Sequence, residues 1–309
     1  MTTKDNLIYK DLPDETMNKI LDRVKNEPWR KVVFEEVFPI NEFLYHIMTD
    51  TSRADGQYLL PIKKGSLVAD IGAGYGTFAI LLAKRGTQVL AIDPSPKRLE
   101  FLKECAIQEG VLKYITLISA HAQRLPLKDK KCDAVIMNGV LEWVGEFSND
   151  ENVLSSQKKA LKEVYRILSN NGVFYLGIEN REGLKYLLGA PEDHSGIPYV
   201  SLLSRTDADI VSENINKKPY KTHTYNKKEY LELLKSVGFK KTEFYSALPD
   251  YKLPKVFFED DLEIEKYLST NLSLALAKTK KPEWFTTKNL LEKGLYHKFS
   301  NSFVMISYK

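Results

Sequence analysis

Between residues 67 and 178, short apolar runs alternate with amphipathic stretches along the chain. This alternation is typical of repeated βα units, which assemble into a parallel sheet. Helical spacing of apolar positions predicts the connecting helices, at residues 78–85, 97–108 and 158–168. The apolar runs predict five strands, at residues 67–71, 88–92, 115–119, 133–138 and 173–178.

The segments on either side predict additions to this core. Residues 1–60 mix charges and aromatics at helical spacing, which predicts a helical N-terminal cap on a core at residues 61–180. Residues 181–226 are irregular and too long for an ordinary connector, so we expect an insertion over the strand ends that serves as a substrate lid. Residues 227–309 are expected to complete the sheet.

Within this last segment, a helix is predicted at residues 228–237 because Gly238 can end it in a left-handed conformation. Strands are predicted at 239–245 and 302–308, and a second insertion at 249–296 contains an acidic helix candidate at 259–276. The predicted fold class is α/β: a doubly wound, mostly parallel, seven-stranded sheet with helices on both faces.

Composition narrows the class of protein. The chain has 309 residues, of which 43% are hydrophobic, enough for a substantial core. Its 45 basic and 41 acidic residues alternate in sign, whereas nucleic-acid-binding proteins usually concentrate basic residues in one patch. The chain has no apolar run of membrane-spanning length, and its first residues lack the apolar run of a signal peptide. We therefore expect a cytoplasmic protein with no membrane span and no nucleic-acid partner.

The cysteines exclude two further classes of site. Cys105 and Cys132 are the only cysteines, and neither lies in a paired metal-ligand spacing. A disulfide framework and a zinc site are therefore unsupported, and no metal is predicted from the sequence.

A glycine-rich turn follows the first predicted strand. Asp70-Ile71-Gly72-Ala73-Gly74-Tyr75-Gly76 joins that strand to the next helix. Glycine permits the unusual backbone angles of such a turn and lets the main chain approach a ligand. The Asp70 carboxylate can accept hydrogen bonds from the amino group of an amino-acid moiety. The alternative is a glycine turn that binds nothing.

A second acidic residue ends the next predicted strand. Asp93 can accept hydrogen bonds from both hydroxyls of a ribose, which NAD also possesses. A dinucleotide turn has the spacing G-x-G-x-x-G, but position 77 is threonine and the observed pattern is D-x-G-x-G-x-G. This spacing disfavours a nicotinamide oxidoreductase.

Four stretches, taken in order, resemble the motifs of class I S-adenosylmethionine (SAM)-dependent methyltransferases: residues 70–76, Asp93, 120–127 and 133–138. The resemblance covers residues 60–180 and implies a Rossmann-like fold with S-adenosyl-L-methionine as cofactor. It implies that Asp70 and the glycines hold the methionine part and Asp93 the ribose hydroxyls. The cofactor-binding set that it implies comprises Asp70, Gly72, Ala73, Gly74, Gly76, Asp93, Pro94, His121, Ala122, Asn138 and Gly139.

His121 departs from the family pattern, which commonly has an aspartate that accepts from the adenine amino group. A neutral imidazole can accept that bond through one nitrogen, and a purely structural His121 is the alternative. The stretch Asn138-Gly139-Val140-Leu141-Glu142-Trp143-Val144 resembles a subgroup of the family. It lies where the family lines the sulfonium and the substrate entrance, so Trp143 is either a wall of the methyl donor or a core residue.

Four residues are candidates for the proton-removing or orienting group: Glu142, Glu179, His194 and His223. Glu179 ends the fifth predicted strand, at the edge where open α/β sheets bind ligands. His194 and His223 lie in the predicted insertion, and imidazole titrates near neutral pH. The alternative is that each histidine caps a loop.

These observations predict a methyltransferase that acts on an oxygen or nitrogen of a small molecule, such as a sugar or secondary metabolite. Two alternatives stay open: a non-catalytic subunit that binds SAM or a nucleotide, and an RNA methyltransferase. The RNA alternative is disfavoured because neither cysteine follows a proline and because Asn138 continues as Gly139-Val140 rather than as Pro-Pro-aromatic.

Overall fold

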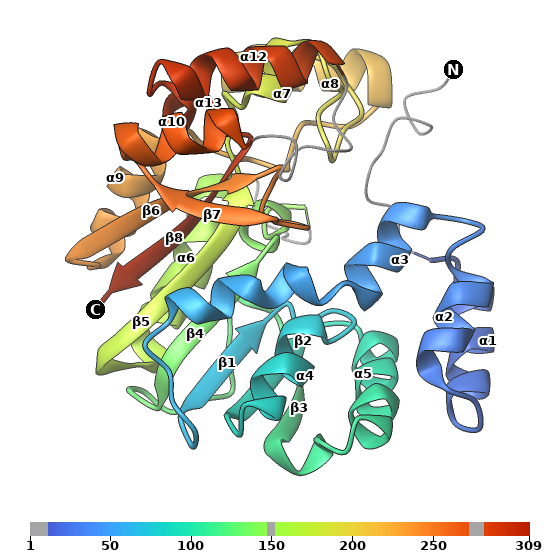
Figure 1. Cartoon of the computed structure of the whole chain (residues 1–309). Helices are drawn as coiled ribbons and strands as arrows, with labels where there is room; N and C mark the ends of the chain where they lie inside the picture. The colour runs from blue at the N-terminus through green and yellow to red at the C-terminus, as the bar shows by residue number, and fades with distance from the viewer. Residues whose placement is uncertain (1–11, 147–151, 272–280) are drawn as a thin grey trace.

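The computed structural model describes residues 12–146, 152–271 and 281–309. Its centre is an eight-stranded sheet with the order β3-β2-β1-β4-β5-β8-β6-β7 (Figure 1). Strands β1 to β5 are parallel, β8 is antiparallel to both β5 and β6, and β7 is antiparallel to β6. The strands are β1 (Leu67–Ile71), β2 (Gln88–Asp93), β3 (Ile115–Ser119), β4 (Cys132–Asn138), β5 (Leu168–Glu179), β6 (Lys241–Leu248), β7 (Val256–Glu259) and β8 (Ser302–Tyr308).

The predicted α/β class is confirmed, but the strand number is wrong. The eighth strand, β7, lies inside the segment that we predicted as an insertion at 249–296. It has only four residues and lies at the edge of the sheet, so its apolar run is shorter than those of the inner strands. The antiparallel placement of β7 and β8 also makes the sheet mixed.

The inner strands are apolar because both of their faces are covered. In β4, Ala134, Val135, Ile136 and Met137 are all fully buried. A parallel strand between two helical layers gives such a continuous apolar run. Three predicted strands, at 67–71, 115–119 and 302–308, have the observed bounds.

Helices cover both faces of the sheet, as predicted. One face packs against α4 and α5 together with the N-terminal helices, and the other packs against α6 and α9. The first layer comprises α1 (Asp14–Val24), α2 (Trp29–Glu36), α3 (Glu42–Thr49), η2 (Thr51–Leu59), α4 (Thr77–Lys84) and α5 (Pro96–Gln108). The second comprises α6 (Val153–Ile167) and α9 (Lys227–Val237).

Local capping explains one difference from the prediction. The helix expected at 158–168 begins five residues earlier, at Val153. Asn152 caps it, since its side chain accepts a hydrogen bond from the Ser155 amide at 3.1 Å. Asparagine satisfies the free amides of a first helical turn in this way.

The remaining helices lie above the carboxyl ends of the parallel strands (Figure 1). The predicted acidic helix at 259–276 is observed as α10, and residues 272–276 lie outside the described part of the chain. Asn180 pairs with Tyr225 in an isolated bridge, which joins the two ends of the 181–226 segment. The upper elements are η4 (Leu141–Trp143), α7 (Leu184–Leu187), η5 (Val200–Leu202), α8 (Arg205–Asn216), α10 (Leu262–Thr270), α12 (Lys281–Glu292) and α13 (Tyr296–Phe299); η3 (Leu112–Tyr114) precedes β3.

The sheet order fixes where a ligand can bind. β1 lies between β2 and β4 in the sheet. Strands β2 and β3 follow on one side of β1, and β4 and β5 on the other, so the strand order reverses between β1 and β4. Ligands of open α/β sheets bind at this switch point, outside the carboxyl ends of the strands. None of the helices within the described ranges is both long and apolar enough to cross a membrane.

The buried face of α6 gives a stability prediction. Leu161→Ala should lower the free energy of unfolding by about 2–5 kcal/mol, because Leu161 is fully buried and its truncation leaves a cavity. Leu154→Ala on the same helix is the matched control, since Leu154 is 40% exposed, and should cost less than about 0.5 kcal/mol. Urea unfolding measures both, and equal losses would contradict this orientation of α6.

Candidate functional site

A cavity of about 470 Å³ lies at the carboxyl ends of β1, β2 and β4. The turn after β1, the end of β2 and the segment after β4 line it. The sheet order therefore brings together motifs that are separate in the sequence. Among the predicted site residues, those that line it are Asp70, Gly72, Ala73, Gly74, Gly76, Asp93, Pro94, His121, Ala122, Asn138, Gly139, Glu142 and His194.

The glycine turn needs glycine at specific positions. Gly72 has φ +70° and Gly76 has φ +91°, which side chains rarely allow. A Cβ on Gly72 would collide with the Val140 side chain, and one on Gly76 with Leu102. Gly76 also caps the N-terminus of α4, so the turn, the segment after β4 and the helix are packed together.

Asp70 presents a buried carboxylate oxygen to the cavity. The residue is 3% exposed, and its Oδ2 atom has no hydrogen-bond partner within the structure. Burial raises the pKa of Asp70 to about 7; the Arg53 charge lowers this pKa and the Asp93 charge raises it. A buried oxygen without a donor is costly, which favours a ligand that brings one.

Asp93 holds the glycine turn in place. Its Oδ2 atom accepts from the Gly74 amide at 2.9 Å, and its Oδ1 atom accepts from the Ser95 amide at 2.9 Å. Each carboxylate oxygen can accept a second hydrogen bond. Asp93 can therefore support the turn and bind a ligand hydroxyl pair at the same time.

The other predicted cofactor residues follow β3 and β4. His121 is exposed at the cavity rim, and Ala122 lies beside it. Asn138 is buried, with its Nδ2 atom unpartnered, while its Oδ1 atom accepts from Tyr175 Oη at 3.4 Å. The Gly139 amide donates to the Gly177 carbonyl at 2.8 Å, which ties the end of β4 to β5.

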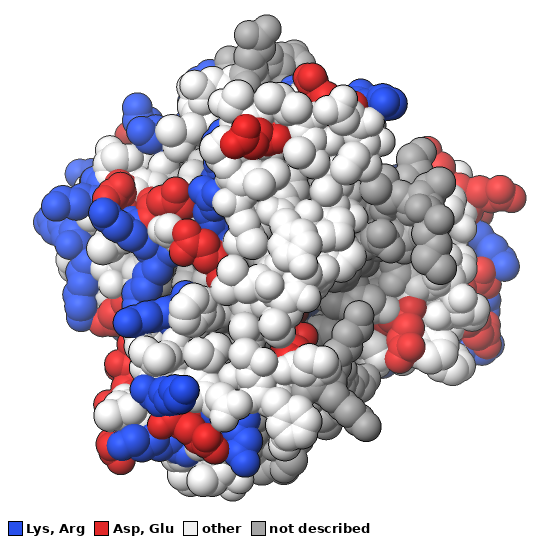
Figure 2. Space-filling view, turned by 90° about the horizontal axis from the view of Figure 1, so that it is seen from above, with Lys and Arg blue, Asp and Glu red and all other residues white. Residues whose placement is uncertain are grey.

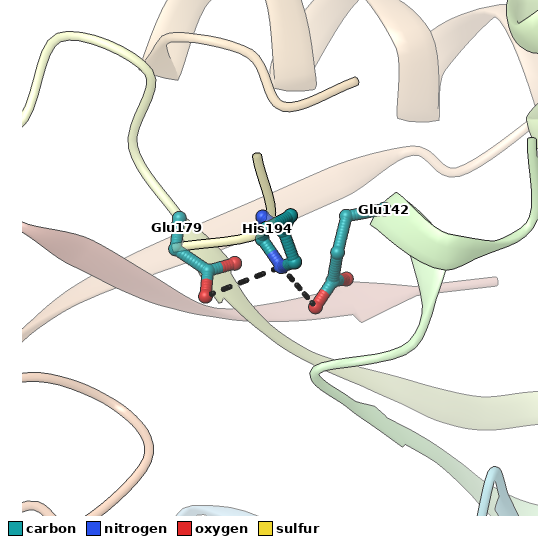
Figure 3. Close-up of side chains that lie close together, drawn as sticks. All are labelled: Glu142, Glu179 and His194. Atoms are coloured by element: carbon teal, nitrogen blue, oxygen red, sulfur yellow. Dashed lines mark ion pairs between the residues drawn. The ribbon is translucent and has the colours of Figure 1, made fainter. Parts of the chain in front are cut away.

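Three polar side chains meet at the other end of the cavity (Figure 3). His194 Nε2 lies 3.8 Å from Glu142 Oε1 and 4.0 Å from Glu179 Oε1. Glu142 and Glu179 are each 1% exposed, and their Oε2 atoms have no partner within the structure. Glu179 lies at the end of β5 but is not among the residues that line the cavity.

Glu142 is positioned by the helix beneath it. Gln157 of α6 is fully buried, and its Nε2 atom donates to the Leu141 carbonyl at 3.0 Å and to the His223 carbonyl at 2.9 Å. The short helix η4 that carries Glu142 is therefore fixed to α6. Trp143 of the same helix lines the cavity, with its ring edge-on to His194 at a centroid distance of 4.8 Å.

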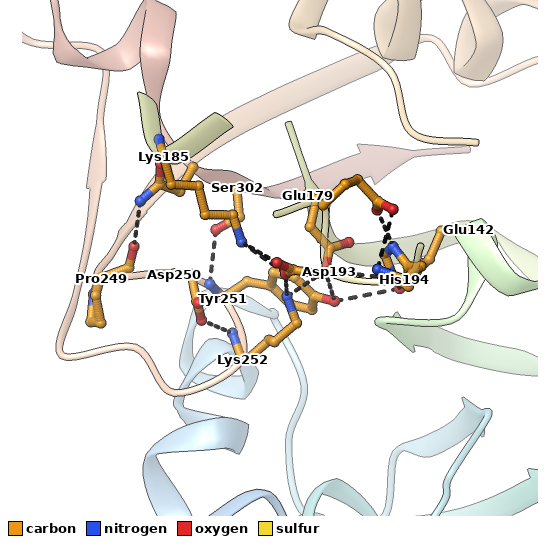
Figure 4. A network of polar contacts seen from close by, with 12 residues as sticks. Glu142, Glu179, Lys185, Asp193, His194, Pro249, Asp250, Tyr251, Lys252 and Ser302 are labelled. Carbon is orange, nitrogen blue, oxygen red and sulfur yellow. Dashed lines mark hydrogen bonds and ion pairs between the residues drawn. The ribbon is translucent and has the colours of Figure 1, made fainter. Parts of the chain in front are cut away.

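Two lysines balance part of the buried negative charge (Figure 4). Lys252 Nζ forms an ion pair with Glu179 and another with Asp193 Oδ2 at 2.7 Å. Lys185 Nζ contacts the same Asp193 oxygen at 2.7 Å. Tyr251 Oη donates to Glu179 Oε1 at 3.1 Å and lies 3.5 Å from Glu142 Oε1.

These neighbours set the charge of each group. Burial raises the pKa of Glu142, and the nearby Glu179 charge raises it further. Burial also opposes ionisation of Glu179, but the charges of Lys252 and His194 outweigh it and lower the pKa of Glu179. Burial lowers the pKa of His194, yet the Glu192, Glu179 and Glu142 carboxylates raise it to about 9.

The structure does not bring His223 to this site. His223 is absent from the cavity lining, and its Nε2 atom lies 2.9 Å from the Tyr220 carbonyl, to which a protonated Nε2 donates. Burial and the Arg205 charge lower its pKa to about 4. The geometry therefore supports the loop-capping alternative for this residue.

Sequence reasoning missed three residues of the site. Arg53 of η2 lines the cavity and donates to the Asn138 carbonyl at 3.4 Å, and Tyr251 and Lys252 lie in the loop between β6 and β7. No motif marks them, and they are far in sequence from the residues that they contact. Glu192 and Asp193 could have been added to the candidates from the sequence, because they directly precede the candidate His194.

Residues 69–176 match the family model described as a methyltransferase domain. The matched segment runs from β1 into β5 and contains the glycine turn, Asp93 and Glu142. SAM is the cofactor of this domain. The match therefore favours SAM over a nicotinamide.

Relatives share the same part of the chain. An uncharacterised methyltransferase of Mycobacterium tuberculosis is 30% identical over 115 residues, which cover 37% of this chain and 40% of the relative. The tRNA 5-carboxymethoxyuridine methyltransferase of Escherichia coli is 30% identical over 118 residues, which cover 38% of this chain and 41% of the relative. The match thus spans about two fifths of the length of these relatives.

A solved structure supports the fold of the methyltransferase domain. A candidate O-methyltransferase of Nostoc punctiforme superposes with a TM-score of 0.50 at 15% sequence identity. The superposition covers 96% of this chain and 68% of the other. At this identity the likeness concerns the fold alone.

The buried ion pairs give a second stability prediction. Lys252→Met should lower the free energy of unfolding by about 3–5 kcal/mol, because it leaves Glu179 without its closest cation. Lys255→Met in the same loop is the control: Lys255 is 52% exposed, 3.7 Å from Asp50, and should change stability by less than about 1 kcal/mol. Urea unfolding compares the two, and an equal effect would contradict a structural role for the buried pair.

Proposed function

We propose that the protein is a SAM-dependent methyltransferase that transfers a methyl group to an oxygen or nitrogen of a small molecule. The observation that carries the proposal is the continuity of the cavity. It is lined at one end by the glycine turn and Asp93, and at the other by Glu142 and His194. A methyltransferase needs such continuity because the donor and the acceptor must meet in line.

The cofactor end fits SAM. Bound SAM supplies an electrophilic methyl group on a sulfonium. The unpartnered Asp70 oxygen would accept a hydrogen bond from the amino group of SAM, and the glycine turn would leave room for its methionine part. Asp93 would accept hydrogen bonds from the ribose hydroxyls. His121 and Ala122 would line the adenine, and Asn138, Gly139 and Pro94 complete the enclosure.

The acceptor end offers groups that orient and deprotonate a nucleophile. The Oε2 atoms of Glu142 and Glu179 lack donors. Glu142 lines the cavity and can accept a hydrogen bond from a hydroxyl or amine there, and Tyr251 Oη links it to Glu179. His194 stands between the two carboxylates (Figure 3). Glu142, Glu179 and His194 form the proposed acceptor site. The resemblance of residues 138–144 to a methyltransferase subgroup stays a prediction.

A small acceptor fits the surroundings better than a nucleic acid. The proposed acceptor groups are buried, so a nucleic-acid base could reach them only if it were unpaired or flipped out of its stack. On the face in Figure 2, acidic and basic side chains are interspersed around a broad uncharged area. The substrate of the tRNA-modifying relative is therefore not carried over to this chain.

Binding of SAM tests the cofactor site. Asp93→Ala should weaken SAM binding in calorimetry by about 10- to 100-fold, since hydrogen bonds to a charged group contribute about 1.5–3 kcal/mol. The control is Asp22→Ala: Asp22 is an aspartate of α1 whose side chain is 83% exposed, and this variant should bind SAM like the wild type. Release of S-adenosylhomocysteine in a screen of sugars and phenols then separates an enzyme from a non-catalytic subunit. SAM binding that is absent, or unchanged in Asp93→Ala, would overturn the assignment.

The raised pKa of Asp70 predicts a pH dependence. The ionised carboxylate accepts from the SAM amino group and the protonated one loses this charge, so SAM affinity should fall as pH drops below about 7 and level off above it. The fall approaches about tenfold per pH unit at most. In Asp70→Asn the affinity should be lower and lose this slope. Calorimetry between pH 5.5 and 8.5 checks this, and an equal slope in both proteins would contradict the role of Asp70.

A further inference from the structure

The acceptor end has the geometry of a cation site. One oxygen from each of Glu142 and Glu179 and one nitrogen of His194 all lie within 4.8 Å of one another. The side chains come from η4, the end of β5 and the segment after α7, and they point toward a common centre (Figure 3). The distances of 3.8 and 4.0 Å from His194 Nε2 are too long for hydrogen bonds, so the three groups do not satisfy one another.

Two unpartnered atoms point independently to a ligand. The Oε2 atoms of Glu142 and Glu179 are buried without a hydrogen-bond partner, while their Oε1 atoms lie near Tyr251 Oη. Lys252 reaches Glu179 from the Asp193 side, opposite His194 and Glu142 (Figure 4). The lysine contacts the Oε1 atom of Glu179 and leaves its Oε2 atom without a partner.

A further carboxylate orients the imidazole. His194 Nδ1 lies 2.5 Å from Glu192 Oε1, and Glu192 Oε2 accepts from the amides of His194 at 3.2 Å and Ser195 at 2.8 Å. When His194 is neutral, this arrangement keeps its proton on Nδ1 and leaves a lone pair on Nε2. Metal-bound histidines are commonly held by a carboxylate on the opposite nitrogen in the same way.

A divalent ion can replace the protons that otherwise balance the charge on His194 and Glu142. The connected cluster contains the carboxylates of Glu142, Glu179, Glu192 and Asp193 against the two lysines Lys185 and Lys252. With His194 neutral, two negative charges are left over in a buried place, where unpaired charge is costly. One divalent cation would neutralise both; protons on His194 and Glu142 are the competing solution.

We propose that Glu142, Glu179 and His194 bind one divalent cation of the Mn²⁺ type. Carboxylate ligands favour Mg²⁺ and Mn²⁺, and the imidazole shifts the preference toward a transition metal. The metal site itself does not depend on the proposed function, but its consequence for the reaction does. In a methyltransferase, a cation at the acceptor end selects an acceptor that coordinates through oxygen. It thereby favours O-methylation over N-methylation.

Titration with MnCl₂ tests the site on the full chain after removal of metals by a chelator. The electron paramagnetic resonance signal of free Mn²⁺ decreases as the ion binds, and the decrease should correspond to one bound ion per chain. Glu142→Gln, Glu179→Gln and His194→Gln should each weaken binding by at least about 100-fold, and Glu192→Gln by about 10- to 100-fold. The control is Glu265→Gln, because Glu265 is a buried glutamate that pairs with His297 in another part of the fold and should leave Mn²⁺ affinity unchanged.

A spectroscopic measurement covers the case in which a variant fails to fold. Electron spin echo modulation of bound Mn²⁺ in the wild type should show coupling to an imidazole nitrogen. Absence of stoichiometric binding, binding without nitrogen coupling, or equal loss in Glu265→Gln would each overturn the metal site. Titration of SAM is independent: SAM binding without Mn²⁺ binding rejects only this inference, and Mn²⁺ binding without SAM binding rejects only the proposed cofactor.

Discussion

The buried carboxylate of Glu179 is the constraint on which the upper half of the structure depends. It lies at the end of a central strand, where an ionised group without partners would be strongly destabilising. Its partners come from two distant segments: His194 from the stretch after α7, and Tyr251 with Lys252 from the loop after β6. Both segments must therefore fold over the same edge of the sheet, and this closes the cavity around the acceptor end.

The antiparallel strand β8 makes that closure possible. Just before it, Asn301 accepts from the Lys185 amide at 2.9 Å through Oδ1 and from the Asn180 amide at 3.1 Å through its carbonyl. At its first residue, Ser302 Oγ accepts from the Tyr251 amide at 2.8 Å. The start of one strand thus positions both segments that supply partners to Glu179. An antiparallel last strand brings its amino end to the edge where the parallel strands have their carboxyl ends, so it can serve this function.

The cofactor half of the fold was predictable from the sequence because its interactions are local. The glycine turn, Asp93 and the strands before them lie within about thirty residues, and apolar runs with turn residues mark each element. The acceptor half was not predictable to the same depth. Glu142, Glu179 and His194 were candidates because of their places after strands or in an insertion, but their convergence depends on tertiary packing.

The residues that sequence reasoning missed show the physical reason. Lys252 lies 73 positions from Glu179 and 59 from Asp193, and no periodic pattern links a lysine in a loop to a carboxylate at that separation. Strand β7 was missed because it has only four residues and lies at the edge of the sheet, inside a segment without a regular apolar pattern. His223 and His194 lie in the same predicted insertion, and only the tertiary contacts of His223 with Gln157 and Tyr220 place it outside the cavity lining.

The division between the two halves also bears on how the relatives are used. The segment shared with the methyltransferase domain family ends at residue 176, before Glu179, His194, Tyr251 and Lys252. Of the proposed acceptor groups, only Glu142 lies within it. The shared segment therefore contains the proposed SAM site, whereas the other groups proposed to select the acceptor belong to segments outside the match. The proposed methyl acceptor is therefore argued from the chemistry of those buried groups rather than from the substrates of proteins that share the matched segment.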